Sequence, residues 1–320
     1  MKKILICFLI IISSLAFVGC SQEKTPPVPE KTITIGVMPD LESIPFIIAE
    51  KNGYFKNQGI QVKIEHFNSA KDRDSALQSG KLDGVITDIL AVVFANEGGI
   101  NLRIISKSDG NIELMAGKTS GINAINEIKG KSVGMSTNTV MEYTFDKMLE
   151  AIPYSLGYAT RIQPEDIKKV AIPPLPTRLE MLQGAKIDAA ILPEPLAGLA
   201  VKNGAKVLSS TDQLGNKAGA IAFTAKSLQE NPEQIKAVFR AYNDAVAYLQ
   251  KDPIASDIDF IIQAQSFPAE VKDSLKLPKY TKAELPSEKV FNDVVQWVKA
   301  KNLIKGSYEY KALVDDEFLR

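Results

Sequence analysis

An apolar run that ends in a carboxylate between two prolines places the strongest constraint on the fold of this chain. Ala189–Leu192 is continuously apolar, which is typical of a strand buried inside a parallel sheet. The following Pro193-Glu194-Pro195 stops the strand and opens a helix. Open α/β sheets bind their ligands at the carboxyl ends of the strands, so Glu194 is the first predicted ligand contact.

Strand and helix patterns alternate before this run. Predicted strands lie at Thr32–Val37, Ile60–His66, Gly84–Thr87 and Leu102–Ser106, and helix start signals such as the N-cap Asp88 stand between them. This β-α-β-α-β-α-β order predicts a doubly wound parallel sheet with right-handed crossovers.

The pattern then restarts and later returns to the first sheet. Predicted strands at 111–116, 131–135, 168–172, 187–192 and 205–209 form a second sheet, and 218–225 is the return strand. We therefore expect an α/β fold of two lobes, one formed by 32–111 plus 213–320 and one inserted at 112–212. Beyond 225 the spacing of apolar residues predicts helices at 232–249, 253–265, 268–275 and 287–301.

The N-terminus has the pattern of an export signal. Lys2 and Lys3 precede an apolar run, Ile4–Val18, that rises about 22 Å as a helix and is too short for the ~30 Å core of a bilayer. Residues 1–19 are therefore a predicted signal peptide. Gly19-Cys20 resembles a bacterial lipobox with Phe17 where leucine is usual, which implies lipid attachment at Cys20 and a linker over 20–31. An ordinary signal peptide with an incidental cysteine is the alternative.

Composition argues against several classes of function. Lys plus Arg and Asp plus Glu both number 38, so no basic excess indicates nucleic acid as a partner. The chain has a single histidine, His66, and no G-x-S-x-G or phosphate-loop motif. No cysteine remains for chemistry once Cys7 leaves with the leader and Cys20 is acylated. We expect neither an enzyme nor a metal or cofactor site.

The order of the segments resembles one protein family. An arginine-bearing helix precedes GAKIDAAILPEP at residues 184–195, and a second helix then leads to Gly204–Leu208. Gly53-Tyr54-Phe55 and the closing Leu313–Leu319 segment add to the likeness. The chain beyond its leader resembles the solute-binding proteins of ABC importers in the nitrate, sulfonate, taurine and thiamine-pyrimidine group. The resemblance implies a type II periplasmic-binding-protein fold, whose two hinged lobes close on a small solute and dock on a permease driven by its ATPase.

If this topology holds, loops from both lobes meet at the cleft and supply the solute contacts. The predicted ligand-binding residues are Asp40, Glu42, Ser43, Asp88, Thr137, Asn138, Thr139, Arg178 and Glu194. Each has a structural alternative. Asp88 and Ser43 are also helix N-caps, and Thr139 with Glu142 has the spacing of a capping box. A second box, Thr177 with Glu180, would begin a helix on which Arg178 faces solvent.

Other candidates have stronger structural interpretations. Lys217 lies near the second crossing between lobes, and Tyr143, Tyr154 and Tyr158 could stack on a planar ligand but are more typical of a core. Trp297 is expected to pack the last helix.

The candidate set is rich in carboxylates, which favours a nitrogenous solute such as an aminopyrimidine over nitrate or a sulfonate. We expect a monomer, anchored by its lipid on the extracytoplasmic face of the cell membrane, that delivers its solute to an ABC permease. A ligand-sensing lipoprotein without transport is the main alternative, and an enzyme on the same fold is a further one.

Overall fold

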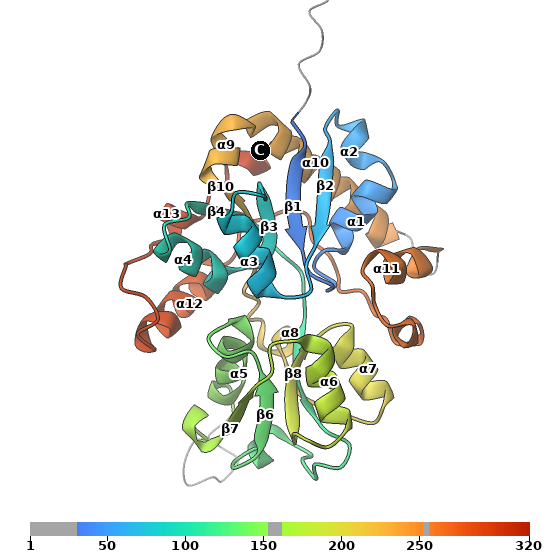
Figure 1. Cartoon of the computed structure of the whole chain (residues 1–320), viewed down its shortest axis with the longest axis vertical. Coiled ribbons are helices and arrows are strands. Elements are labelled where there is room, and N and C mark those ends of the chain that lie inside the picture. The colour runs from blue at the N-terminus through green and yellow to red at the C-terminus, as the bar shows by residue number, and fades with distance from the viewer. Residues whose placement is uncertain (1–30, 153–161, 252–255) are drawn as a thin grey trace, which may run out of the picture. The chain divides into compact units, whose positions relative to one another are not determined.

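The computed structural model describes residues 31–152, 162–251 and 256–320. Within them the chain forms two five-stranded sheets with helices on their faces (Figure 1). The predicted signal peptide, the Cys20 lipid site and nearly all of the linker lie outside the described residues, as do Tyr154 and Tyr158.

The first sheet is mixed rather than wholly parallel. Its strand order is β2-β1-β3-β10-β4, with β1 parallel to β2 and β3, and β10 antiparallel to β3 and β4. The four strands predicted to be parallel, β1 to β4, therefore do run in the same direction, and only the return strand β10, for which the sequence predicted no direction, is antiparallel. The chain leaves this sheet at the carboxyl end of β4 and re-enters it at that same end of the strands. The return strand β10 must therefore run opposite to β3 and β4. The bounds are β1 (Ile33–Val37), β2 (Val62–His66), β3 (Gly84–Asp88), β4 (Leu102–Lys107) and β10 (Gly219–Thr224).

The second sheet repeats this plan. Its order is β7-β6-β8-β5-β9, in which β6 is parallel to β7 and β8, while β5 is antiparallel to β8 and β9. The chain passes from the first sheet to the second at residues 108–111 and returns to the first at residues 211–218. The exact lobe boundaries, 32–111 plus 213–320 and 112–212, stay a prediction. The bounds are β5 (Ile112–Ala116), β6 (Ser132–Met135), β7 (Lys168–Ala171), β8 (Ala189–Pro193) and β9 (Lys206–Ser210).

Helices cover both sheets, and their bounds correct some sequence predictions. The predicted helix at 268–275 is a 3₁₀ segment, Ala269–Asp273, and the one at 253–265 is described only from 256 onward. The helices are α1 (Ile44–Lys51), α2 (Tyr54–Asn57), α3 (Ala70–Gln78), α4 (Ile89–Glu97), α5 (Val140–Glu150), α6 (Leu175–Gln183), α7 (Leu196–Lys202), α8 (Thr211–Leu214), α9 (Ala225–Glu230), α10 (Pro232–Lys251), α11 (Ile258–Ala264), α12 (Glu288–Ala300) and α13 (Tyr310–Leu313). Further 3₁₀ segments are Ile125–Glu127, Pro164–Asp166 and Glu317–Leu319.

Proline, and not the predicted capping box, begins α6. The helix begins at Leu175 with Pro176 in its first turn, so Thr177 lies inside the helix rather than at its N-cap. The fixed φ and missing N–H of proline suit the first turn, and the N-cap accordingly lies at Pro174, three residues before the predicted Thr177. By contrast α3 begins at a side-chain cap, because the Ser69 hydroxyl accepts a hydrogen bond from the Asp72 N–H at 3.2 Å.

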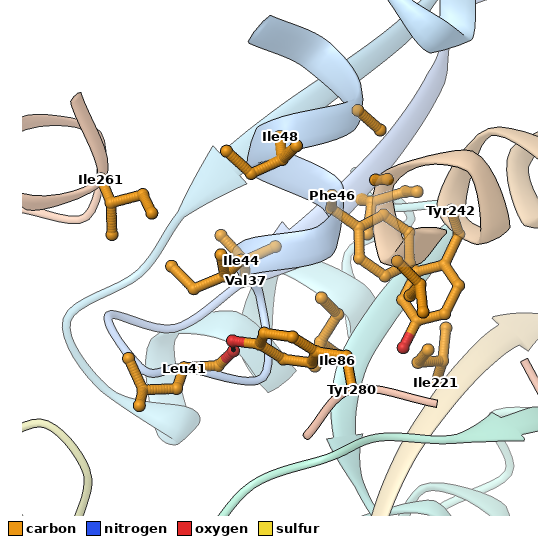
Figure 2. Packing of buried hydrophobic residues seen from close by; sticks show 14 of the residues in the cluster. Val37, Leu41, Ile44, Phe46, Ile48, Ile86, Ile221, Tyr242, Ile261 and Tyr280 are labelled. Atoms are coloured by element: carbon orange, nitrogen blue, oxygen red, sulfur yellow. Dashed lines mark hydrogen bonds between the residues drawn. The ribbon is translucent and has the colours of Figure 1, made fainter. Parts of the chain in front are cut away.

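Alternate residues along the strands of the first sheet point to opposite faces and belong to two separate apolar clusters. Ile86 and Ile221 pack with α1 and α10, whereas Val85 and Ala222 pack with α3, α4 and α12. In Figure 1 α3 and α4 lie on the viewer's side of this sheet and α10 passes behind it. Figure 2 shows the first cluster, in which the rings of Phe46 and Tyr242 are 5.2 Å apart. The sheet is thus buried on both faces, and only its strand ends and connecting loops are free to build a site.

Candidate functional site

The loop between β1 and α1 is held from within and from the C-terminal region. Ser43 is fully buried, and its hydroxyl donates to the Met38 carbonyl at 3.1 Å and to Asp40 Oδ1 at 2.9 Å. Ser43 occupies the N-cap position of α1, yet its side chain caps no helix N–H. The hydroxyl instead fixes the Asp40 carboxylate, whose pKa is raised by burial.

Two side chains from the C-terminal part of the sequence, Gln265 and Tyr280, hold the backbone of this loop by hydrogen bonds. The Tyr280 hydroxyl donates to the Leu41 carbonyl at 2.6 Å, as Figure 2 shows, and Gln265 Nε2 donates to the Asp40 carbonyl at 2.9 Å. The loop that carries three predicted ligand residues is therefore fixed by hydrogen bonds at Asp40, Leu41 and Ser43.

Glu42 lies where the chain crosses between the two sheets. It accepts a hydrogen bond from the Ser108 hydroxyl on the first crossing. A Cβ atom on Gly110 would lie 2.7 Å from Glu42 Cδ, and one on Gly219 would lie 2.7 Å from Glu42 Oε2. Burial, and then the charge of Asp40, raise the pKa of Glu42 to about 8.

Asp88 is the N-cap of α4, as its position after β3 predicted. Its Oδ1 accepts from the Ala91 N–H at 2.8 Å. Burial raises the pKa of Asp88 to about 6, although that hydrogen bond and the charge of Arg73 oppose the rise. The guanidinium of Arg73 is itself engaged, because Nη1 donates to the Ile86 carbonyl at 2.9 Å and Nη2 to Asp74 at 2.8 Å.

The loop between β6 and α5 presents Thr137 and Asn138 as exposed residues and Thr139 as a half-buried N-cap. Thr139 Oγ1 accepts from the Met141 N–H at 3.2 Å. The predicted capping box is not closed, because Glu142 accepts from the Asn138 N–H at 2.6 Å rather than from Thr139. Asn138 has a φ of 56°, a left-handed conformation in which its own N–H can reach the Glu142 carboxylate.

Glu194 follows β8 as predicted, and the Glu194–Pro195 peptide bond is cis. Its Oε2 accepts from the Gly198 N–H at 2.9 Å in the first turn of α7. Burial raises its pKa. Glu113 on the neighbouring strand β5 has its pKa raised to about 7 by burial and then by the charge of Glu194. Two carboxylates of the second sheet therefore share a poorly solvated region.

The position of Arg178 on a capped helix had indicated a solvent-facing side chain, but the structure buries it. Its side chain is 0% exposed, and Nε donates to the Ile172 carbonyl at 2.9 Å. Nη1 donates to the Ile191 carbonyl at 2.7 Å, and Nη2 to Ser136 Oγ at 2.6 Å and the Pro173 carbonyl at 3.2 Å. Burial lowers the pKa of Arg178 to about 10, so it stays charged at neutral pH. These contacts make Arg178 a support for the β6–α5 loop rather than a free anion contact.

The structure brings only some of the predicted residues together. Asp88 from the first sheet, with Asn138 and Thr139 from the second, line one groove of about 440 Å³. Glu42 lines a separate hollow of about 20 Å³, which is room for one water molecule. The other predicted ligand residues do not line either of these two hollows within the described part of the chain.

Sequence reasoning missed the other residues around Glu42. Thr144 and Thr211 line the small hollow with Gly110, Gly219 and Lys217, which pairs with Asp212 at 2.6 Å. Their nearness to the two crossings was the available signal, and it had drawn attention only to Lys217. Tyr143 is fully buried and belongs to the core.

The described residues contain neither a membrane-spanning helix nor a cluster of metal ligands. No helix in 31–152, 162–251 or 256–320 is long and apolar enough to cross a membrane. In the same ranges no group of three or more His, Cys, Asp or Glu side chains is placed to hold a metal ion.

Comparison with known proteins gives a consistent picture. The sequence model of the NMT1/THI5-like family matches residues 40–256, more than half of the chain. A putative aliphatic sulfonates-binding protein of Bacillus subtilis (strain 168) is 23% identical over 336 aligned positions, which cover 100% of this chain and 96% of the relative. A putative ABC transporter periplasmic binding protein of Brachyspira hyodysenteriae is 24% identical over 78% of this chain and 73% of its own length.

The fold is also that of a solved binding protein. The alkanesulfonate-binding protein SsuA from Xanthomonas axonopodis pv. citri, bound to MOPS, aligns with a TM-score of 0.74 and 16% identity. The alignment covers 90% of this chain and 99% of that protein. The α/β periplasmic-binding-protein fold expected from the sequence is thereby confirmed, with mixed rather than purely parallel sheets.

Proposed function

This chain belongs to the NMT1/THI5-like family, and from that premise we propose that its solute is a small organic molecule with hydrogen-bond-donating nitrogen. The chain captures a small solute and delivers it to an ABC permease, a role supported by its relatives. Its place is extracytoplasmic, like that of those relatives.

The charge of the candidate site carries the proposal for the solute. The half-buried carboxylates Glu42 and Asp88 come from the first sheet, and Glu113 and Glu194 from the second. Burial raises the pKa of all four. Asp88, whose pKa is raised to about 6, is mostly ionised at pH 7, so it gains from a donor nitrogen and would be further destabilised by a sulfonate or nitrate.

The arginines near these carboxylates do not reverse this preference. Arg178 donates to three backbone carbonyls and one hydroxyl, and Arg73 is divided between a carbonyl and Asp74. Lys217 is paired with Asp212. A bidentate arginine clamp, which favours anion recognition, is therefore not offered by either of these two guanidinium groups.

Calorimetry on protein freed of ligand by unfolding and refolding tests the proposal. We expect aminopyrimidines or alkylamines to bind, and taurine, alkanesulfonates and nitrate to bind more weakly by at least tenfold. Asp88→Asn should weaken amine binding about tenfold or more, since it removes one charge-assisted hydrogen bond. Asp244→Asn, on the exposed face of α10, is the matched control and should bind like the unaltered protein. Tight sulfonate binding with no response to amines would overturn the proposed solute class.

Export and lipid attachment belong to the same proposal. Cys20 would be acylated after removal of residues 1–19, which would hold a monomer on the extracytoplasmic face of the membrane. Labelling of cells with an alkyne-bearing fatty acid should mark the protein, and Cys20→Ser should abolish the label and release the protein from the membrane fraction. Label that persists in the Cys20→Ser variant would refute attachment at that residue.

We propose that the chain is not an enzyme. His66, the only histidine of the sequence, lies at the end of the edge strand β2, where its side chain is largely exposed. Partial desolvation of the imidazole lowers its pKa. His66 lines neither the groove at Asp88 nor the small hollow at Glu42. A sensing lipoprotein would have the same site, and loss of solute uptake on deletion of the gene separates transport from sensing.

A further inference from the structure

The groove that contains Asp88 continues away from the polar loops between two helices. It runs between α3 and α4 over β3, with Leu77, Leu90 and Phe94 on its walls and Val85 on its floor. Figure 1 shows α3 and α4 side by side on one face of the first sheet. Leu77, Leu90 and Val85 are buried in the apolar cluster of that face and Phe94 is half-buried against it, so the groove exposes only the outer part of this cluster.

The lining of the groove is chemically mixed. Asp88, Asn138 and Thr139 offer oxygen acceptors and an amide, and polar side chains of α3 such as Lys71 and Gln78 also line it. Phe94, Ala95 and Ile100 supply half-buried apolar surface. A volume of about 440 Å³ lies within the roughly 300–1,000 Å³ typical of small-molecule pockets, and an apolar lining with a few convergent polar groups is their usual composition.

We propose that the groove between α3 and α4 binds the apolar tail of the transported solute, whose polar head lies at Asp88 and Thr139. The identity of the head as a donor nitrogen rests on the proposed function. The solute class is then an amphiphilic amine with a linear alkyl chain or a single ring. A compact polar solute would leave the half-buried Phe94, Ala95 and Ile100 in contact with water and gain nothing from them.

Two homologous series measure the tail and the head separately. n-Alkylamines from ethyl to octyl, and n-alkanesulfonates of the same lengths, are titrated by calorimetry into the purified, refolded protein. We expect amine affinity to rise about fourfold for each added methylene until the groove is filled, and then to level off. Amine binding with no dependence on chain length overturns the groove and leaves the head group standing. A chain-length dependence confined to sulfonates leaves the groove standing and overturns the head group.

Substitutions in the wall identify the groove as the place of the tail. Ala95→Phe fills it from α4 and should remove the gain from chain length, while ethylamine binds as before. Phe94→Ala widens it and should move the levelling-off point to longer chains, which keeps the test valid if the first variant folds poorly. Ala300→Phe, at the exposed end of α12, is the matched control. A full chain-length gain in Ala95→Phe together with an unmoved levelling-off point in Phe94→Ala would refute the proposal.

Discussion

The indole N–H of Trp297 in α12 donates a hydrogen bond to Asp146 Oδ2 in α5 at 2.9 Å. The ring of Tyr143, one turn earlier on α5, meets the Trp297 ring edge-on at 83°, with centroids 5.9 Å apart. Lys169 donates to Asp146 at 3.0 Å from the other side. Because α12 packs on α4 of the first sheet and α5 packs on the second, this contact joins the two sheets away from their chain crossings.

Trp297→Phe should destabilise the protein by about 1–2 kcal/mol. The substitution keeps an aromatic ring against Tyr143 but leaves a buried oxygen of Asp146 without its indole donor. Urea unfolding at pH 7 measures the change. Lys299→Ala, exposed on the same helix, should stay within about 0.5 kcal/mol of the unaltered protein. If both variants lose the same stability, the hydrogen bond to Asp146 contributes nothing specific.

The sequence predicted the local elements well because their signals are local. The N-cap at Asp88, the turn at Glu194 and the ten strands were confirmed from apolar periodicity and capping residues. Two details differed for equally local reasons: α6 begins before its predicted N-cap, and the capping box at Thr139 is not closed although Thr139 is the N-cap of α5. Pro176 lies in the first turn of α6, so the helix begins before Thr177. Asn138 has a left-handed conformation, and its N–H rather than that of Thr139 donates to the Glu142 carboxylate.

The arrangement of distant segments could not be read in the same way. Nothing in Gly219–Thr224 alone specifies that it lies between β3 and β4, because that choice depends on packing against segments far along the chain. The burial of Arg178 depends on carbonyls from β8 and from the end of β7. The surroundings of Glu42 are set by both crossings at once. Residue type indicated which side chains carry chemistry, whereas tertiary structure decides which of them meet.

Glu42 should make the stability of the protein fall as pH rises. Its pKa of about 8 lies above the 4.5 of an ordinary glutamate, so the folded state holds a proton that the unfolded state has released. Between pH 4.5 and 8 the unfolded state binds fewer protons, and the free energy of unfolding falls by at most about 1.4 kcal/mol per pH unit for this group. Asp40 and Asp88 act in the same direction at lower pH, since burial raises their pKa to about 6.

Glu42→Gln therefore should be more stable than the unaltered protein at pH 8.5, and the two should approach each other at pH 5. The amide imitates the protonated acid, so it is spared the cost of ionising at that position. Thermal melts at pH 5, 7 and 8.5 test this. An unchanged slope of stability against pH in the variant would assign the titration to other groups.

Gly219→Ala should lower stability by about 1–3 kcal/mol, because its new Cβ would overlap Ser108 Oγ and lie 2.7 Å from Glu42 Oε2, two atoms that share a hydrogen bond. The shorter side chain in Glu42→Ala should relieve that overlap, so the double variant should be more stable than the sum of the two single effects predicts. Gly98→Ala, whose nearest neighbours would lie at 3.4 Å, is the control. Strict additivity in the double variant would show that Glu42 does not fill the space beside Gly219.

Arg178→Lys should cost about 2–4 kcal/mol of stability, although the charge is kept. One ammonium cannot replace the planar guanidinium, whose nitrogens donate to Ile172, Ile191 and Ser136 from fixed directions. The unpaired carbonyls are buried, and each lost hydrogen bond leaves a desolvated acceptor. Arg240→Lys, exposed on α10, should change stability by less than about 0.5 kcal/mol in the same urea titration. A small effect at Arg178 would mean that water can enter and replace the donors, in which case the guanidinium would also be reachable by an anionic solute.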